Sequence, residues 1–152
     1  MNAPAPPEYG RPAVVIDLDR CIGCWACGIA CKMKNDLPEG QWWLRVDTVG
    51  GGEWDVSSGS FPDPRKYYRP VIERCSYSIL QAERGLLPDC VKACPVDAMR
   101  FGERDRADSR IAADLRSPDA THVGNPPGSA FAVTYLPPRT QMRQRRSGYL
   151  QS

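Results

Sequence analysis

Several features that define large classes of protein are missing from this 152-residue sequence. No apolar run approaches the 18 residues that a transmembrane helix needs, so we expect no direct membrane insertion. The formal net charge is only +2, which gives no strong attraction to nucleic acid. The single histidine, His122, has no Ser/His/Asp set around it, and there is no glycine-rich phosphate loop. We therefore predict that the chain is not an enzyme by itself.

Apolar residues are also modest in number. Hydrophobic residues make up 41% of the chain and the mean hydropathy is −0.47, which allows a core but a thin one. Fifteen prolines and thirteen glycines predict many turns and loops. A small, loop-rich domain usually needs stabilisation beyond its hydrophobic core, and bound metal can supply it.

Seven cysteines in two groups supply the chemistry that the sequence does contain. The first group has the spacing x2, x2, x3 and consists of Cys21, Cys24, Cys27 and Cys31. The second consists of Cys75, Cys90 and Cys94, the last of which precedes Pro95. The first spacing is typical of the iron–sulfur run of bacterial ferredoxins. Zinc sites usually use separated cysteine pairs, and an odd count fits disulfides poorly, so both are weaker alternatives.

The bacterial run also predicts which cysteines share a cluster. Its fourth cysteine binds the other cluster, whereas the first three share theirs with a distant cysteine. Cluster one, a [4Fe–4S] centre, is therefore expected on Cys21, Cys24, Cys27 and Cys94. Cluster two is expected on Cys31, Cys75 and Cys90.

Cluster two has no fourth cysteine. The second group has the pattern Cys-x2-X-x11-Cys-x3-Cys-Pro, and Ser78 occupies position X. Three thiolates and an open corner favour the loss of one iron, so we expect a [3Fe–4S] cluster. A [4Fe–4S] cluster whose fourth iron is held by serine, water or substrate is the alternative, and a degenerate, empty site is a third possibility.

Small residues within the first run allow the backbone to approach a cluster closely. Gly23, Ala26 and Gly28 have this role, although ordinary turn formation explains them equally well. Trp25 is expected either to shield cluster one from water or to pack as a core aromatic.

The pattern of apolar residues predicts an α+β fold: a ferredoxin-like two-cluster core of short strands and short helices, with a loop-rich insertion and an extended C-terminal tail. The expected elements, in chain order, are strand 13–17, helix 29–35, strand 42–49, helical turn 78–84, short helix 90–94 and strand 98–101.

Three regions are expected along the chain. Residues 1–12 are a flexible lead, and residues 13–104 form the dicluster domain with its insertion at 50–70. Residues 105–152 are a tail without cysteine. Within this tail, residues 131–136 form a convincing strand with no obvious partner in the chain, so we expect the tail to pack on a partner subunit.

The two motifs resemble those of a known family. Residues 21–32 with 35–46, and residues 74–102, are similar to the first and last motifs of the electron-transfer subunits of the dimethyl sulfoxide reductase family of molybdenum enzymes. Residues 108–111 and 131–136 resemble the closing segment of those subunits more weakly, and the likeness covers about residues 13–138.

The resemblance implies both a cofactor set and a partner. Family members usually carry four cysteine motifs and up to four clusters, so this chain looks like a shortened, two-cluster form. Related subunits that lack the cysteine equivalent to Ser78 hold a three-iron cluster. The family also implies a large catalytic subunit that carries a molybdopterin guanine dinucleotide (bis-MGD). The chain would pass electrons between that subunit and a membrane anchor subunit, a cytochrome or a soluble carrier.

The N-terminus has no basic or apolar leader, which predicts a cytoplasmic location. Export together with a partner that carries the signal would instead place the chain in the periplasm. Three further functions remain open: a free-standing ferredoxin-like carrier, a module whose clusters only stabilise the fold, and a zinc-binding interaction protein.

Overall fold

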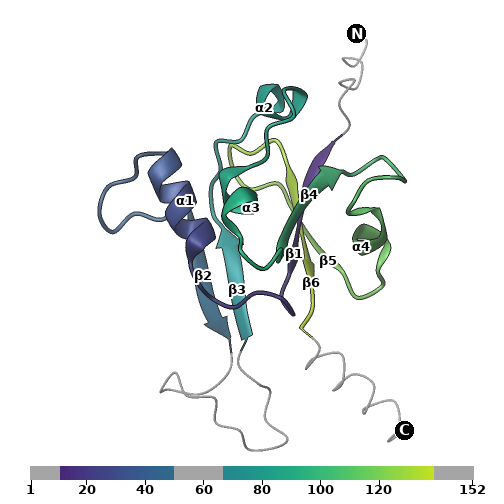
Figure 1. The fold of residues 1–152 in the computed structure, drawn as a ribbon, viewed down its shortest axis with the longest axis horizontal. Coiled ribbons are helices and arrows are strands. Elements are labelled where there is room, and N and C mark those ends of the chain that lie inside the picture. The colour runs from purple at the N-terminus through teal and green to yellow at the C-terminus, as the bar shows by residue number, and fades with distance from the viewer. Residues whose placement is uncertain (1–10, 50–66, 139–152) are drawn as a thin grey trace, which may run out of the picture.

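The computed structural model describes residues 11–49 and 67–138, which form two small sheets and four short helices (Figure 1). The strands are β1 (Pro12–Asp17), β2 (Leu44–Val49), β3 (Tyr67–Ile72), β4 (Met99–Glu103), β5 (Thr121–Gly124) and β6 (Ala132–Leu136). The helices are α1 (Ala26–Lys34), α2 (Ile79–Glu83), α3 (Asp89–Ala93) and α4 (Ala112–Arg116). The prediction of a mixed α and β fold is confirmed.

The larger sheet has the strand order β4-β1-β6-β5. β1 pairs with β4 in antiparallel fashion, with Ile16 opposite Met99, and with β6 in parallel fashion, with Val14 opposite Val133. The run Val14–Ile16 is fully buried because a central strand is covered on both faces. The first predicted strand is thus found as the middle of the sheet.

The expectation that residues 131–136 lack a partner within the chain is wrong. β6 lies between β1 and β5 and pairs with both. Its pairing with β1 joins residues more than a hundred positions apart, which local sequence patterns cannot reveal. The sheet therefore extends across the predicted domain boundary at residue 104, while residues 139–152 lie outside the described part.

The two faces of β1 contact different parts of the molecule. Val14 and Ile16 belong to the main core, which also contains the fully buried Phe131. Ala13 and Val15 pack on the opposite face against Ile111, just before α4. The alternation follows from the two-residue period of a strand. The segment after residue 104 thus covers one face of the sheet.

The smaller sheet pairs β2 with β3, with Thr48 opposite Tyr68. Residues 67–70 were expected within the loop-rich insertion, but they form the first part of β3, because two adjacent tyrosines favour a strand. Residues 50–66 of the predicted insertion lie outside the described residues, as do residues 1–10 of the predicted lead.

The helices differ from expectation mainly at their ends. α1 begins at Ala26, inside the cysteine run, three residues before the predicted start. α2 follows Ser78, as the predicted helical turn requires. None of the helices in the described residues has the length and apolar character needed to cross a membrane.

Candidate metal centres

Two neighbouring helices carry cysteines: α1 carries two of the first group, and α3 with its C-cap carries two of the second. Cys27 and Cys31 lie four residues apart on α1, and Cys90 and Cys94 lie four residues apart at α3 and its C-cap. Four residues correspond to one turn, about 6 Å of rise, so each pair faces the same side of its helix. α1 and α3 pack against each other, as Figure 1 shows. This packing brings the two cysteine groups together.

The first cavity, which we call site one, contains about 310 Å³ of space free of protein atoms, part of it open to solvent. Four cysteines line it: Cys21, Cys24, Cys27 and Cys94. The other residues that line it are all apolar: Ile22, Trp25, Val46, Pro70, Val96, Ala98 and Met99. Site one therefore surrounds any group bound there with an apolar wall.

The second cavity, site two, contains about 360 Å³ of such space. It is lined by Cys31, Cys75 and Cys90. In contrast to site one, most of its remaining lining is polar or charged: Lys34, Asn35, Ser76, Gln81 and Asp89, with Tyr77 and Pro88. The structure thus brings the seven cysteines together as four and three, in the grouping that the spacing predicts.

Burial acts strongly on several of these thiols. It raises the pKa of Cys27 to about 12, with a further contribution from the neighbouring Cys21, Cys94 and Cys24. Burial raises the pKa of Cys90 as well, and Cys75, Cys27 and Cys31 add to the effect. Packed thiolates without a counter-charge repel one another, whereas coordinated metal deprotonates such thiols and compensates their charge. The donor set therefore fits a thiolate-bound cluster.

The cavities also fit a cluster in their shape. The thiols surround cavities, which is the arrangement that a centre of several iron atoms needs.

Hydrogen-bond donors point at three of the cysteine sulfurs. The amide of Ala98 donates to Cys94 Sγ over 3.3 Å, and the amide of Tyr77 donates to Cys75 Sγ over 3.4 Å. Asn35 Nδ2 lies 3.6 Å from Cys31 Sγ. Such donors orient the ligands and stabilise negative charge on sulfur. Asn35 was not singled out from the sequence, although its position four residues after Cys31, at the end of α1, places it on the same helix face.

The glycines of the first run are required by close contacts. Gly23 has a φ of +71°, and a Cβ there would lie 2.6 Å from the ring of Tyr68. A Cβ on Gly28 would lie 3.0 Å from the carbonyl oxygen of Leu44. Trp25 lines site one and stacks edge-on against Trp42, with 5.1 Å between ring centroids. Trp42 thus packs against one of the residues that line site one.

Ser78, the residue expected at the open corner of cluster two, caps helix α2. Its backbone amide donates to Gln81 Oε1 over 2.8 Å, and its hydroxyl accepts from the Gln81 amide over 3.4 Å, which forms a capping box at α2. Ser78 is not among the residues that line site two, whereas Ser76 and Gln81 are. No pattern in the sequence marks these two residues, because neither lies at a cysteine position.

Several curated proteins are similar to the chain in sequence. The arsenate respiratory reductase iron–sulfur subunit ArrB of Shewanella sp. is 32% identical over 95 residues, 62% of this chain and 33% of that protein. A polypeptide of the anaerobic dimethyl sulfoxide reductase of Escherichia coli is 31% identical over 96 residues, 63% of this chain and 42% of that protein. The chain is related to the iron–sulfur subunits of the dimethyl sulfoxide reductase family. The resemblance inferred from the cysteine motifs is thereby confirmed.

In some relatives the similarity extends over most of the chain. A sulfite dehydrogenase subunit of Allochromatium vinosum is 28% identical over 145 residues, which cover 90% of this chain and 49% of that protein. The chain spans about a third to a half of the length of these relatives. No family model matches the chain.

Proposed function

We propose that this chain is an electron-transfer subunit that binds two iron–sulfur clusters, one at site one and one at site two. The observation that carries the proposal is the convergence of seven cysteines, from residues 21 to 94, around two neighbouring cavities. Bound clusters would accept and release single electrons. The chain itself would bind and tune them and catalyse no reaction.

The different walls of the two sites support different roles. The apolar wall of site one disfavours the additional negative charge of a reduced cluster, whereas polar groups at site two stabilise it. Three cysteines at site two favour a [3Fe–4S] centre, and four at site one favour a [4Fe–4S] centre. Electrons would therefore reside preferentially at site two.

For the partner, we propose a large molybdopterin (bis-MGD) subunit, with a cytochrome, soluble carrier or membrane anchor at the other end. The support is that relatives are named as parts of arsenate and dimethyl sulfoxide reductases. The cytoplasm is the proposed location, and co-export to the periplasm is the alternative.

A free-standing carrier is the second candidate, because β6 completes a sheet within the chain and needs no partner strand. Size-exclusion chromatography of native extract separates the two candidates. Elution with a large molybdenum-containing subunit supports the first, and elution as a monomer with intact clusters supports the second.

The test of cluster binding is direct. Anaerobically purified protein should be brown and contain iron and acid-labile sulfide, and after air oxidation it should give the spin-half signal of a three-iron cluster in electron paramagnetic resonance. Protein without iron and sulfide would refute the proposal. Protein with both, but without the spin-half signal, would refute only the three-iron assignment.

Replacing Ser78 tests whether cluster two lacks one iron because it lacks a fourth cysteine. We expect Ser78→Cys to abolish the spin-half signal, because residue 78 lies between Tyr77 and Gln81, which line site two, and a thiolate freed from the helix cap offers the fourth iron a ligand. The matched control is Ser78→Ala, which removes the same capping hydroxyl and should cost about 1 kcal/mol of stability while leaving the signal intact. Loss of the signal in both variants would attribute the effect to the helix cap instead.

A further inference from the structure

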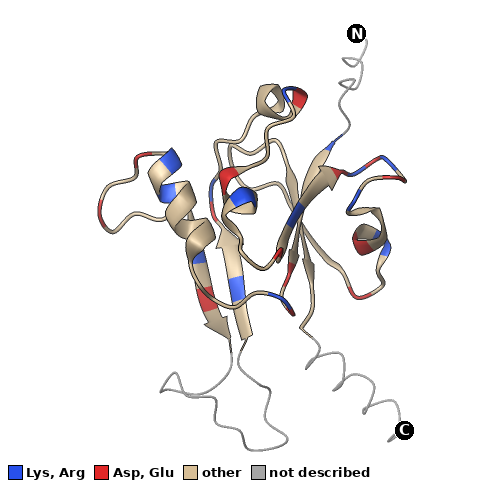
Figure 2. Ribbon diagram, viewed as in Figure 1, with Lys and Arg blue, Asp and Glu red and all other residues tan. Residues whose placement is uncertain are grey.

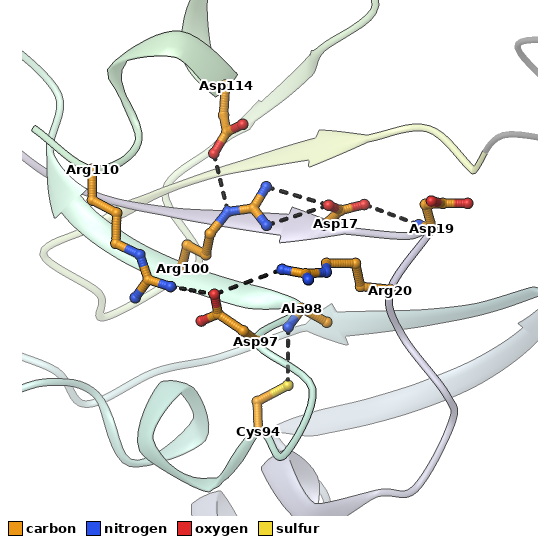
Figure 3. Close-up of polar contacts among 9 residues, drawn as sticks. All are labelled: Asp17, Asp19, Arg20, Cys94, Asp97, Ala98, Arg100, Arg110 and Asp114. Atoms are coloured by element: carbon orange, nitrogen blue, oxygen red, sulfur yellow. Dashed lines mark hydrogen bonds and ion pairs between the residues drawn. The ribbon is translucent and has the colours of Figure 1, made fainter.

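One ion pair joins two loops that carry cysteines of site one (Figure 3). One loop leads from β1 through Arg20 to Cys21, and the other leads from Cys94 through Asp97 to β4. Arg20 Nη1 lies 3.8 Å from Asp97 Oδ2, so an ion pair joins residues that are 77 positions apart in the sequence.

A third segment completes this cluster of charges. Arg110, in the turn before α4, forms an ion pair with the same carboxylate oxygen of Asp97. Asp97 therefore lies between two guanidinium groups, one from the loop of Cys21 and one from the segment without cysteine. Figure 2 shows acidic and basic residues interspersed over the loops beside β1, β4 and α4.

A second, more buried group of ion pairs lies beside the pairs of Asp97. Arg100 Nη1 lies 3.3 Å from Asp17 Oδ2, and Arg100 Nε donates to Asp114 Oδ2 over 3.0 Å. The Arg100 side chain is only 11% exposed. The ion pairs of Arg100 thus connect β1, β4 and α4. The ion pairs of Asp97 connect the segments next to the same three elements.

Asp97 has an unusual backbone conformation. Its φ is +55°, in the left-handed region that side chains other than glycine rarely adopt. The next residue, Ala98, donates its amide to Cys94 Sγ over 3.3 Å, and its carbonyl accepts from the amide of Asp17 over 2.7 Å. The turn at Asp97 is therefore what aims the Ala98 amide at a sulfur of site one.

We propose that Asp97 and Arg110 are positioning residues of site one. Arg110 holds the Asp97 carboxylate, with Arg20 on its other side, and this maintains the left-handed turn that directs the Ala98 amide to Cys94 Sγ. The N–H dipole stabilises the more negative, reduced form of a cluster, so the contact raises the potential of site one. The inference rests on the proposed function and adds a role for the segment without cysteine.

Arg110→Gln tests the role of the ion pair, and Arg106→Gln is its matched control. Arg106 lies on the same exposed segment but pairs with Glu103 and Asp108. In Arg110→Gln we expect a more negative midpoint potential at site one, an unchanged one at site two, and faster hydrogen exchange in the peptide that contains Ala98. Arg106→Gln should change none of these. Identical behaviour of the two variants would overturn the proposal.

Asp97→Gly and Asp97→Ala separate backbone geometry from charge. Both remove the carboxylate, but only glycine adopts a positive φ without strain. We expect a more negative potential at site one in the alanine variant than in the glycine variant, and equal potentials would overturn the proposal. The wild-type protein separates the two levels of inference: absence of clusters refutes the proposed function, whereas intact clusters without these differences refute only the positioning role.

Discussion

Cys94→Ala should remove the four-iron cluster of site one and leave site two intact, although Cys94 belongs to the second cysteine group. The reason is its place in the structure, where it lines the same cavity as Cys21, Cys24 and Cys27. Because three thiolates remain at site one, we expect the variant to lose at least one iron and the [4Fe–4S] signal of the reduced protein, and to keep the spin-half signal of the oxidised protein.

Cys90→Ala is the matched control, since Cys90 lies one helical turn before Cys94 and lines site two. It should remove the spin-half signal and retain the [4Fe–4S] signal. If the two variants lost the opposite signals, the grouping of the cysteines would be wrong. Because both change a cysteine to alanine at α3, disruption of the helix alone would affect them equally.

Phe131→Ala should lower the free energy of unfolding by about 3–5 kcal/mol, the usual loss when a large aromatic is removed from a core. Phe131 is fully buried directly before β6, and its ring lies 5.7 Å from that of Tyr77. Urea unfolding of the anaerobic protein, followed by circular dichroism, measures the change.

The control is Val123→Ala on β5, where the side chain is 61% exposed and the expected change is within about 0.5 kcal/mol. The pair of variants also tests whether residues 131–136 serve a partner. If Phe131→Ala kept its stability and only weakened a complex, residues 131–136 would act at an interface rather than in the core.

The sequence predicted local elements well and distant pairings poorly. The β-branched run at residues 13–17 and the apolar residues at 98–101 identified β1 and β4, because a strand's own side chains carry that signal. The partner of residues 131–136 could not be found, since a parallel pair across more than a hundred residues leaves no local pattern. The strand β3 (Tyr67–Ile72) could not be predicted because the residues before it in the sequence resemble a loop.

At the candidate sites, the ferredoxin spacing was sufficient to predict which cysteines lie together. It could not indicate the walls of the two cavities, which come from residues such as Val46, Pro70 and Gln81 on separate elements. Nor could it predict the left-handed turn at Asp97, because aspartate adopts that region at only a minority of its positions. Whether the seven thiols bind iron stays a prediction.

The position of β1 in the sheet has a consequence for biosynthesis. β1 is translated first, yet both strands beside it, β4 and β6, are translated much later. At about 5–20 residues per second, the ribosome needs roughly 6–24 s to proceed from Asp17 to Leu136. During that interval the apolar strand β1 and the four thiols of Cys21–Cys31 are exposed, because the segments that later cover them have not been synthesised. We therefore expect iron to be delivered only after translation has passed Cys94, the last cysteine in the sequence that lines either site.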